Sequence, residues 1–191
     1  MFLRNAWYVA AWEREVADKP VPVRALDEKI VLYRKTDGTV AALEDACPHR
    51  KLPLSMGRIH GDQIECGYHG MMFDCSGACT KAPATDRPPS TAVVRSYPME
   101  ARYGLLWIWM GDGIADLSKM PRFDELEPAD ISKRSRVDFG RMPVPYDYIV
   151  DNLLDLSHVS FLHDGVLGNA DTVSAETKAV QTGDSVTIER W

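Results

Sequence analysis

The alternation of apolar and polar positions predicts that the first part of the chain is rich in β-strands. Short apolar runs bounded by Gly, Pro, Asp or Ser are typical of strands, and they occur at residues 29–34, 39–45, 63–66, 71–74, 93–101 and 105–110. The first two runs flank an Asp37-Gly38 pair, which is a strong signal for a tight hairpin turn. We therefore expect residues 1–112 to form a mainly β domain.

The pattern changes after this domain. Residues 113–134 are polar, contain proline and show no periodicity, which is typical of a linker. Apolar residues then recur at helical spacing and predict one helix from about Pro145 to His163. Alternation at residues 184–191 predicts a further strand. We expect residues 135–191 to begin a second domain that contains both helix and strand.

Charge and apolar run length exclude some classes of partner. The 191-residue chain has a formal net charge of −6 and no basic block, which argues against a nucleic-acid partner. No segment reaches the roughly 18–20 apolar residues of a membrane helix, and the N-terminus lacks the apolar stretch of a signal peptide. We therefore expect a cytoplasmic protein with no membrane partner. Its four cysteines are then better candidates for metal ligands than for disulfides.

Two matched Cys/His pairs form the strongest motif. Cys47-Pro-His49 is followed, after sixteen residues, by Cys66-Gly-Tyr-His69. A Rieske 2Fe–2S cluster needs two thiolates on one iron and two imidazoles on the other. A structural zinc also accepts two Cys and two His, but its usual spacing keeps ligands of one kind together. The mixed pairs favour the cluster, and Cys75 and Cys79 then remain as ordinary thiols in a turn.

A carboxylate and two histidines form the second candidate site. Asn152, Asp155 and His158 are three residues apart, so that they share one face of the predicted helix. His163 lies about 140° further around an ideal helix, so both rings can face one metal only if the helix widens or ends. A π-bulge or a helix end at Asp164-Gly165 would achieve this. Two imidazoles and a carboxylate form the facial triad of non-haem iron(II), whereas the simpler alternative is an amphipathic helix with two incidental histidines.

Together, the CPHR…CGYHG and DNLLDLSHVSFLH motifs resemble those of the Rieske non-haem iron oxygenases. The segments FLRNAWYVAAW, EDACPHRKLPLS and RYGLLWIWMGD resemble the vanillate O-demethylase oxygenase group, which includes dicamba monooxygenase-like enzymes. The resemblance implies a mainly β Rieske domain followed by the truncated start of an α+β catalytic domain over residues 135–191. The ligands it implies are Cys47, His49, Cys66 and His69 for the cluster, and His158 and His163 for a mononuclear iron. It also implies that Asp155 bridges this iron to a neighbour's cluster and that Asn152 lies beside the iron.

The same resemblance implies a function. Family members of this group are terminal oxygenase components that hydroxylate or O-demethylate an aromatic acid with dioxygen. They are homotrimers and receive electrons from an NADH-dependent reductase that carries flavin and a plant-type iron–sulfur centre. The family's third iron ligand is an Asp or Glu far downstream, and no carboxylate here occupies that place, so we expect the N-terminal portion of a longer oxygenase. The alternative is an electron-transfer Rieske protein without oxygenase activity, but Rieske ferredoxins are shorter and lack the histidine-bearing helix.

Overall fold

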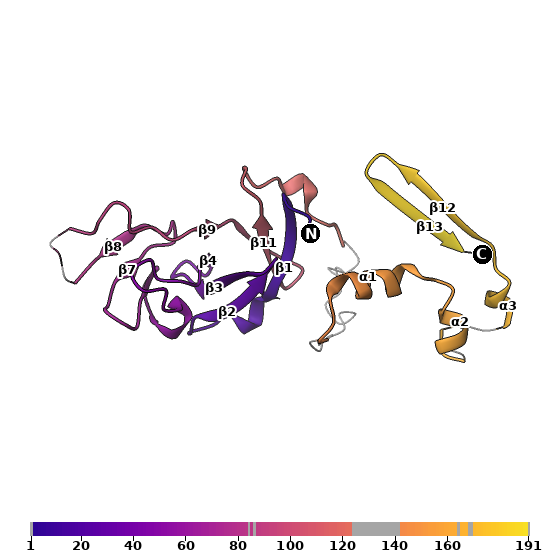
Figure 1. The fold of residues 1–191 in the computed structure, drawn as a ribbon, viewed down its shortest axis with the longest axis horizontal. Coiled ribbons are helices and arrows are strands. Elements are labelled where there is room, and N and C mark those ends of the chain that lie inside the picture. Colours follow the sequence, from indigo (N-terminus) through magenta and orange to yellow (C-terminus); the bar gives the residue numbers. More distant parts are fainter. Residues whose placement is uncertain are drawn as a thin grey trace. The chain divides into compact units, whose positions relative to one another are not determined.

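The computed structural model describes residues 2–83, 85, 87–123, 142–163, 165–167 and 170–190. The chain divides into two compact units, Met1–Arg134 and Ser135–Trp191. Among these residues, the first unit contains strands β1 to β11, coloured indigo to pink in Figure 1. The second contains three short helices and a hairpin in its described part, coloured orange to yellow.

The described residues of the first unit form three antiparallel sheets. One has the order β1-β11-β10, with β1 at Ala6–Trp12, β11 at Leu105–Met110 and β10 at Met99–Arg102. The second has the order β2-β3-β4-β9, with bounds Val21–Ala25, Glu28–Arg34, Val40–Glu44 and Ser96–Tyr97. The third has the order β5-β6-β7-β8, with bounds Arg58–His60, Gln63–Glu65, Met72–Phe73 and Cys79–Lys81. Short 3₁₀ turns lie at Glu13–Glu15, Leu54–Met56 and Leu117–Lys119.

Most strand predictions for this unit are confirmed, with one difference. The hairpin between β3 and β4 turns at Gly38, whose φ of 84° is in the left-handed region that favours glycine. The run at residues 93–101 forms two strands that belong to different sheets, and Pro98 lies between them. Proline has no N–H for a sheet hydrogen bond, so the chain leaves one sheet and enters the next at this residue. Strands β1, β2, β5 and β8 were not predicted.

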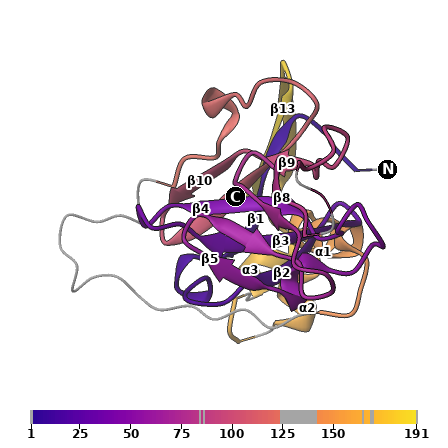
Figure 2. The same cartoon turned by 90° about the vertical axis from the view of Figure 1, so that its left-hand side faces the viewer.

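Strand β3 is buried on both faces, which explains its continuous apolar run. Val31 and Tyr33 pack into one core cluster, whereas Ile30 and Leu32 pack into another. Alternate side chains of a strand point to opposite faces, so one strand contributes to both clusters. The second cluster joins the β1 and β3 sheets, whose strands overlap in the view of Figure 2. The first cluster includes Cys47 and Cys66, so the core of the unit directly anchors both candidate ligand loops.

Part of the predicted linker packs onto the first unit. Met120 is 5% exposed and lies in a cluster with three tryptophans, Trp7, Trp107 and Trp109. The Trp7 indole N–H donates to the carbonyl of Asp116 at 2.8 Å. Residues 124–134 lie outside the described residues.

The second unit contains α1 (Tyr146–Leu154), α2 (Val159–Leu162), α3 (Ala170–Val173) and the hairpin β12 (Thr177–Thr182) with β13 (Ser185–Arg190). The strand predicted near residue 184 is confirmed as β13, but the single helix over residues 145–163 is wrong. Asp155 leaves the helical conformation with a ψ of 90°. Its carboxylate accepts a hydrogen bond from the Ser157 amide, and such local bonds compete with helix formation. None of the helices in the described part of the chain has the length and apolarity needed to span a bilayer.

Candidate metal centres

The two Cys/His loops share one backbone pattern. The Cys47 carbonyl accepts from the Lys51 amide at 2.8 Å, and the Cys66 carbonyl accepts from the Gly70 amide at 3.0 Å. In each loop the cysteine amide also donates to the carbonyl five residues later, at 2.9 and 2.8 Å. The residue four positions after each cysteine is left-handed, with φ of 58° at Lys51 and 71° at Gly70. Two similar turns therefore hold the two cysteines.

Both candidate thiol ligands are buried beneath these turns. Cys47 and Cys66 are each 2% exposed and pack in the same core cluster. Burial raises the pKa of the Cys47 thiol, the His49 amide partly offsets this by hydrogen bonding to the sulfur, and the neighbouring Cys66 raises it again. Two adjacent buried sulfurs are suited to a soft metal centre, because a bound metal keeps such thiols deprotonated.

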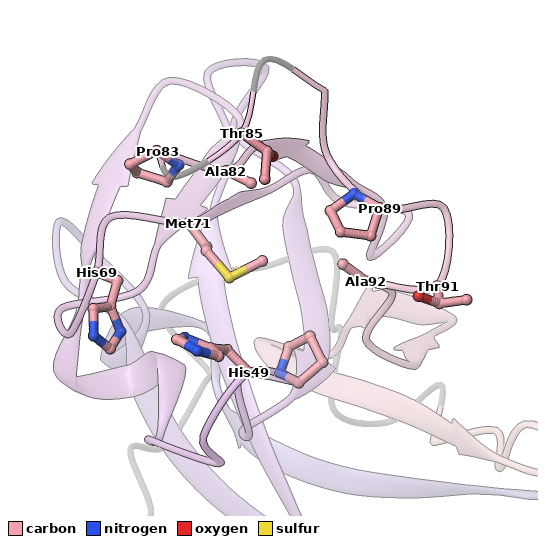
Figure 3. A pocket seen from close by; sticks show the side chains of 10 residues that line it. His49, His69, Met71, Ala82, Pro83, Thr85, Pro89, Thr91 and Ala92 are labelled. Atoms are coloured by element: carbon pink, nitrogen blue, oxygen red, sulfur yellow. The ribbon is translucent and has the colours of Figure 1, made fainter.

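The candidate imidazole ligands lie on the outer side. The rings of His49 and His69 have centroids 4.7 Å apart and an interplanar angle of 56°. Tyr68 packs against His69 with a centroid distance of 4.0 Å. Figure 3 shows both imidazoles at one side of a cavity of about 540 Å³, with Met71 beside them. The rest of the lining is mostly small or apolar: Pro48, Ala82, Pro83, Thr85, Pro89, Thr91 and Ala92.

The donors are therefore arranged as two pairs. In the part of the chain that the structure describes, no three His, Cys, Asp or Glu side chains gather as ligands of a single ion. A single tetrahedral zinc needs all four donors around one point. A Rieske cluster instead takes the thiolate pair on one iron and the imidazole pair on the other. These four residues fit the Rieske cluster.

A buried carboxylate closes the first loop, and sequence reasoning missed it. Asp45 is 5% exposed and accepts from the Ser55 amide and the Ser55 hydroxyl, each at 2.7 Å. Asp45 precedes Cys47 and Ser55 follows the loop, so this contact joins the two ends of the loop. No sequence periodicity marks a pair ten residues apart.

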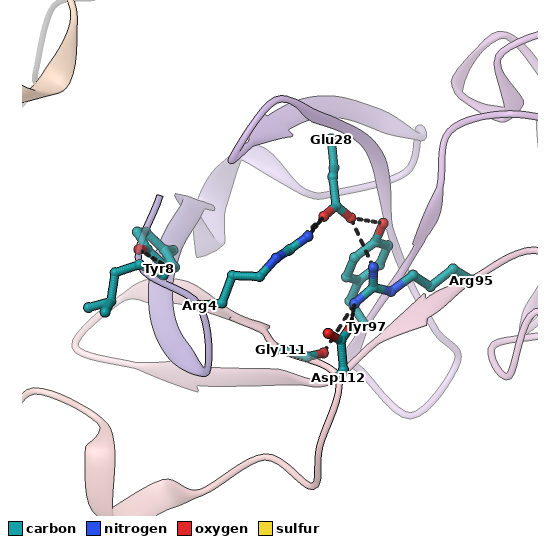
Figure 4. A network of polar contacts seen from close by, with 8 residues as sticks. Arg4, Tyr8, Glu28, Arg95, Tyr97, Gly111 and Asp112 are labelled. Atoms are coloured by element: carbon teal, nitrogen blue, oxygen red, sulfur yellow. Dashed lines mark hydrogen bonds and ion pairs between the residues drawn. The ribbon is translucent and has the colours of Figure 1, made fainter. Parts of the chain in front are cut away.

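A polar network supports the strands that lead into this loop (Figure 4). The Glu28 carboxylate accepts from Arg4 at 2.6 Å, from the Tyr97 hydroxyl at 2.7 Å and from Arg95 at 3.3 Å. Arg95 also donates to the carbonyl of Gly111 at 3.1 Å. Arg4 and Gly111 flank the β1-β11 sheet, whereas Glu28 and Tyr97 belong to the β3 sheet, so the network joins the two sheets.

The segment that follows the first ligand loop meets the second loop where there is no room for a side chain. A Cβ added at Gly57 would lie 1.8 Å from the carbonyl oxygen of Glu65, the residue before Cys66. A Cβ added at Gly67 would lie 3.0 Å from the carbonyl oxygen of Met56. The glycines thus allow direct contact between the two backbones.

The second candidate centre lies around α2. His158 is the N-cap residue and His163 the C-cap residue of this four-residue helix. Their ring centroids are 5.4 Å apart. The helix ends at His163, which confirms the helix-end alternative, although Asp164 itself lies outside the described residues. Among the residues that the structure describes, no third metal-binding side chain joins the two rings.

The contacts of His158 determine which of its ring nitrogens carries the hydrogen. Its Nδ1 lies 2.5 Å from the backbone carbonyl of Asp155. Because a carbonyl only accepts, Nδ1 carries the hydrogen, which leaves the lone pair of Nε2 available to a metal. The Asp155 carboxylate oxygen Oδ2 is 3.9 Å from the same Nδ1, whereas Oδ1 accepts from the amide and hydroxyl of Ser157. These two bonds hold the pKa of Asp155 below its usual value.

The prediction that Asn152, Asp155 and His158 share one face of a single helix is wrong. Asn152 is exposed on the last turn of α1, Asp155 is the C-cap residue of that helix, and His158 begins α2. The reason is the helix break at Asp155, which changes the direction of the chain between the three residues.

Comparisons with known proteins match one domain family in each of the two units. Residues 6–98 match the Rieske [2Fe-2S] domain family, and residues 142–191 match the vanillate O-demethylase oxygenase C-terminal domain family. The chain is 40% identical to a putative toluene-4-sulfonate monooxygenase system iron-sulfur subunit of Comamonas testosteroni, over 100% of this chain and 56% of that protein. It is 38% identical to a vanillate O-demethylase oxygenase subunit of a Pseudomonas species, over 100% of this chain and 53% of that protein.

A solved structure of an oxygenase has the same fold as this chain. The chain superimposes on dicamba monooxygenase bound to dicamba with a TM-score of 0.87 and 37% identity, over 98% of this chain and 56% of that chain. The chain thus spans about half the length of the proteins that it matches.

Proposed function

Because this chain belongs to the Rieske non-haem iron oxygenases, in the group of vanillate O-demethylase oxygenase and dicamba monooxygenase, we propose that it acts in the terminal oxygenase component of a monooxygenase system. The cofactors of this family are a Rieske 2Fe–2S cluster and a mononuclear non-haem iron. The observation that carries the proposal is the presence of two separate donor sets in one chain, one in each unit.

The four loop residues hold the cluster in this proposal. Cys47 and Cys66 bind one iron from the core side, and His49 and His69 bind the other from the outer side. The exposure of the two imidazoles supports a role in passing electrons, because their outer edges are accessible to another protein surface. His158 and His163 hold the mononuclear iron together with a carboxylate from outside the described residues. When bound, this iron supplies the activation of dioxygen, and the cluster supplies electrons.

Asp155 and Asn152 complete the proposed site. Ser157 occupies Oδ1 of Asp155, which leaves Oδ2 to accept an imidazole N–H from a cluster ligand of a neighbouring subunit. A carboxylate suits this place because it only accepts hydrogen bonds when it is ionised. Asn152, at the end of α1, is proposed to lie near the iron without binding it.

The remaining parts of the proposal concern the whole protein. Its substrate is an aromatic acid that is hydroxylated or O-demethylated, as the names of the toluene-4-sulfonate and vanillate relatives suggest. Its electrons come from an NADH-dependent reductase with flavin and an iron–sulfur centre. It works as a homotrimer in the cytoplasm. A pure electron carrier, the alternative function, would have no use for the two histidines that flank α2.

Single-turnover measurement on the native-length protein tests the proposal. Loaded protein should hold about two irons and two sulfides per chain at the cluster, with additional iron at the second centre. A pre-reduced cluster should be reoxidised when dioxygen and an aromatic methoxy acid are added, with release of formaldehyde. His158→Ala should abolish formaldehyde and leave the cluster spectrum unchanged. Full turnover by His158→Ala would remove the oxygenase assignment, and one zinc without labile sulfide would remove the cluster.

A further inference from the structure

The turn between α1 and α2 carries two residues of the proposed site. This interhelix turn consists of residues 155–158, with Asp155 at its start and His158 at its end. Helical hydrogen bonds reach only its two ends, where the Asp155 amide donates to the Asp151 carbonyl and the His158 carbonyl accepts from the Leu162 amide. They do not fix the orientation of the peptide groups in between. Other contacts must therefore determine where the carboxylate and the imidazole point.

One peptide group at the centre of the turn is held from both sides. The Leu156 carbonyl and the Ser157 N–H belong to the same planar unit. The N–H donates to Oδ1 of Asp155 at 2.8 Å. The carbonyl accepts from Nη1 of Arg190, a residue 34 positions away at the end of β13. The Arg190 guanidinium also reaches the Val173 carbonyl at the end of α3, with Nη2 at 3.5 Å.

We propose that Arg190 is a positioning residue for the candidate iron site. Its bond to the Leu156 carbonyl fixes the rotation of the peptide group whose N–H holds the Asp155 carboxylate. The same bond limits the movement of His158, whose Nδ1 donates to the backbone carbonyl of Asp155. This inference rests on the proposed function, since it assumes that His158 binds iron.

Arginine is suited to this role for two reasons. A hydrogen bond from a charged donor is about twice as strong as one between neutral groups. The planar guanidinium presents several N–H groups in fixed directions, so one side chain can hold carbonyls of two elements at once. A lysine has a single ammonium on a flexible chain and would hold these carbonyls less rigidly.

The experiment compares Arg190→Gln with Lys178→Gln in the cluster-loaded, native-length protein. Lys178 is exposed on β12 of the same hairpin, so its replacement removes the same charge. The first measurement is an anaerobic titration with Fe(II) alone. The second is the ¹⁵N spectrum of the His158 ring without mononuclear iron, which reports the ring nitrogen that carries the hydrogen. Arg190→Lys is a third variant that keeps the cation.

Arg190→Gln should weaken Fe(II) binding at the second centre by about ten-fold or more, as is typical when a residue that orients a metal ligand is lost. The His158 ring should change from one tautomer, with hydrogen on Nδ1, to a mixture of both. Lys178→Gln should change neither measurement, Arg190→Lys should give an intermediate loss, and cluster content should stay constant in all variants.

The outcomes separate this inference from the proposed function. Unchanged Fe(II) affinity and an unchanged tautomer in Arg190→Gln would overturn the role of Arg190 and leave the iron site standing. If His158→Ala bound Fe(II) as tightly as the parent protein, the iron site itself would be misplaced. If Arg190→Gln did not fold, Arg190→Lys would provide the test. A parent-like Fe(II) affinity and a parent-like His158 tautomer in that variant would contradict a need for the guanidinium.

Discussion

Replacing Gly57 by alanine tests whether the segment after the first ligand loop must contact the backbone before Cys66 without a side chain between them. The added Cβ would lie 1.8 Å from the Glu65 carbonyl oxygen and 2.9 Å from that of Leu54. Ordinary contact begins at 3.4 Å, so the backbones of Gly57 and Glu65 must separate by roughly 1.6 Å in an interior packed as densely as a crystal. Both obstructing atoms belong to the backbone, so no side-chain rotation relieves the overlap.

The expected loss follows from this geometry. Overpacking a well-packed interior lowers the free energy of unfolding by about 1–3 kcal/mol. Because the clashing atoms are backbone atoms, we expect a loss at the upper end of this range. For a chain of this size, each kcal/mol lowers the Tm by roughly 2–4 °C. The cluster should suffer more than the fold, because Glu65 immediately precedes Cys66 and a shift of its carbonyl displaces a ligand.

The assay measures Tm together with iron and labile sulfide per chain, and Gly113→Ala is the matched control. Nothing lies within 4 Å of a Cβ added at Gly113, and its φ is not in the left-handed region. We expect Gly57→Ala to lose most of its cluster and several degrees of Tm, and Gly113→Ala to lose neither. A Gly57→Ala protein with parent-like Tm and full sulfide content would refute the argument that Cys66 depends on close backbone contact between Gly57 and Glu65.

Two further predictions concern the loop conformation and alkaline pH. Gly70→Ala should cost about 1–2 kcal/mol, because φ at this position is 71°, but should keep the cluster. The cluster should be kept because the nearest atom to the added Cβ is Pro83 Cγ at 3.5 Å, and Lys51 already carries a side chain at the equivalent position of the first loop. Denaturant unfolding followed at the cluster absorbance measures both the stability and the cluster. Loss of the cluster at parent-like stability would contradict this prediction. Burial raises the pKa of the Tyr97 hydroxyl, and the hydrogen bond to the Glu28 carboxylate raises it further. The contribution of Tyr97 to stability is therefore present below the ordinary tyrosine pKa of about 10 and is lost as the pH rises toward the higher pKa of the folded protein. The Tm of the parent protein should therefore fall more steeply above about pH 10 than that of Tyr97→Phe, and equal slopes would exclude Tyr97 as a cause.

The sequence predicted strands best where the apolar run is continuous. Strands β3 and β11 are buried along most of their length, and this burial appears directly in the sequence as consecutive apolar residues. Strand β2 was missed because it contains Pro22 and alternates between half-buried and exposed residues. Strand β1 was missed because it pairs with β11, about a hundred residues away, and no local signal reports such a partner.

The helix prediction failed at a particular residue for a physical reason. The apolar spacing continues through Leu153, Leu154 and Leu156, so periodicity alone extends the helix. Asp155 and Ser157 instead form local hydrogen bonds that stabilise a turn. A periodic pattern does not include the free energy of such bonds, and the break therefore became visible only in the structure.

By itself, the sequence was enough to predict the two candidate donor sets of this protein. The identity and spacing of Cys47, His49, Cys66 and His69 are local properties of two short loops, and the same holds for the two histidines beside α2. Only the tertiary structure decided how these groups are held. The closure of the first loop by Asp45 and Ser55, the contact of Gly57 with Glu65 and the bond from Arg190 to Leu156 join residues 8 to 34 positions apart. Such contacts depend on how the strands pack around a shared core, and that packing is a property of the whole folded unit rather than of any segment.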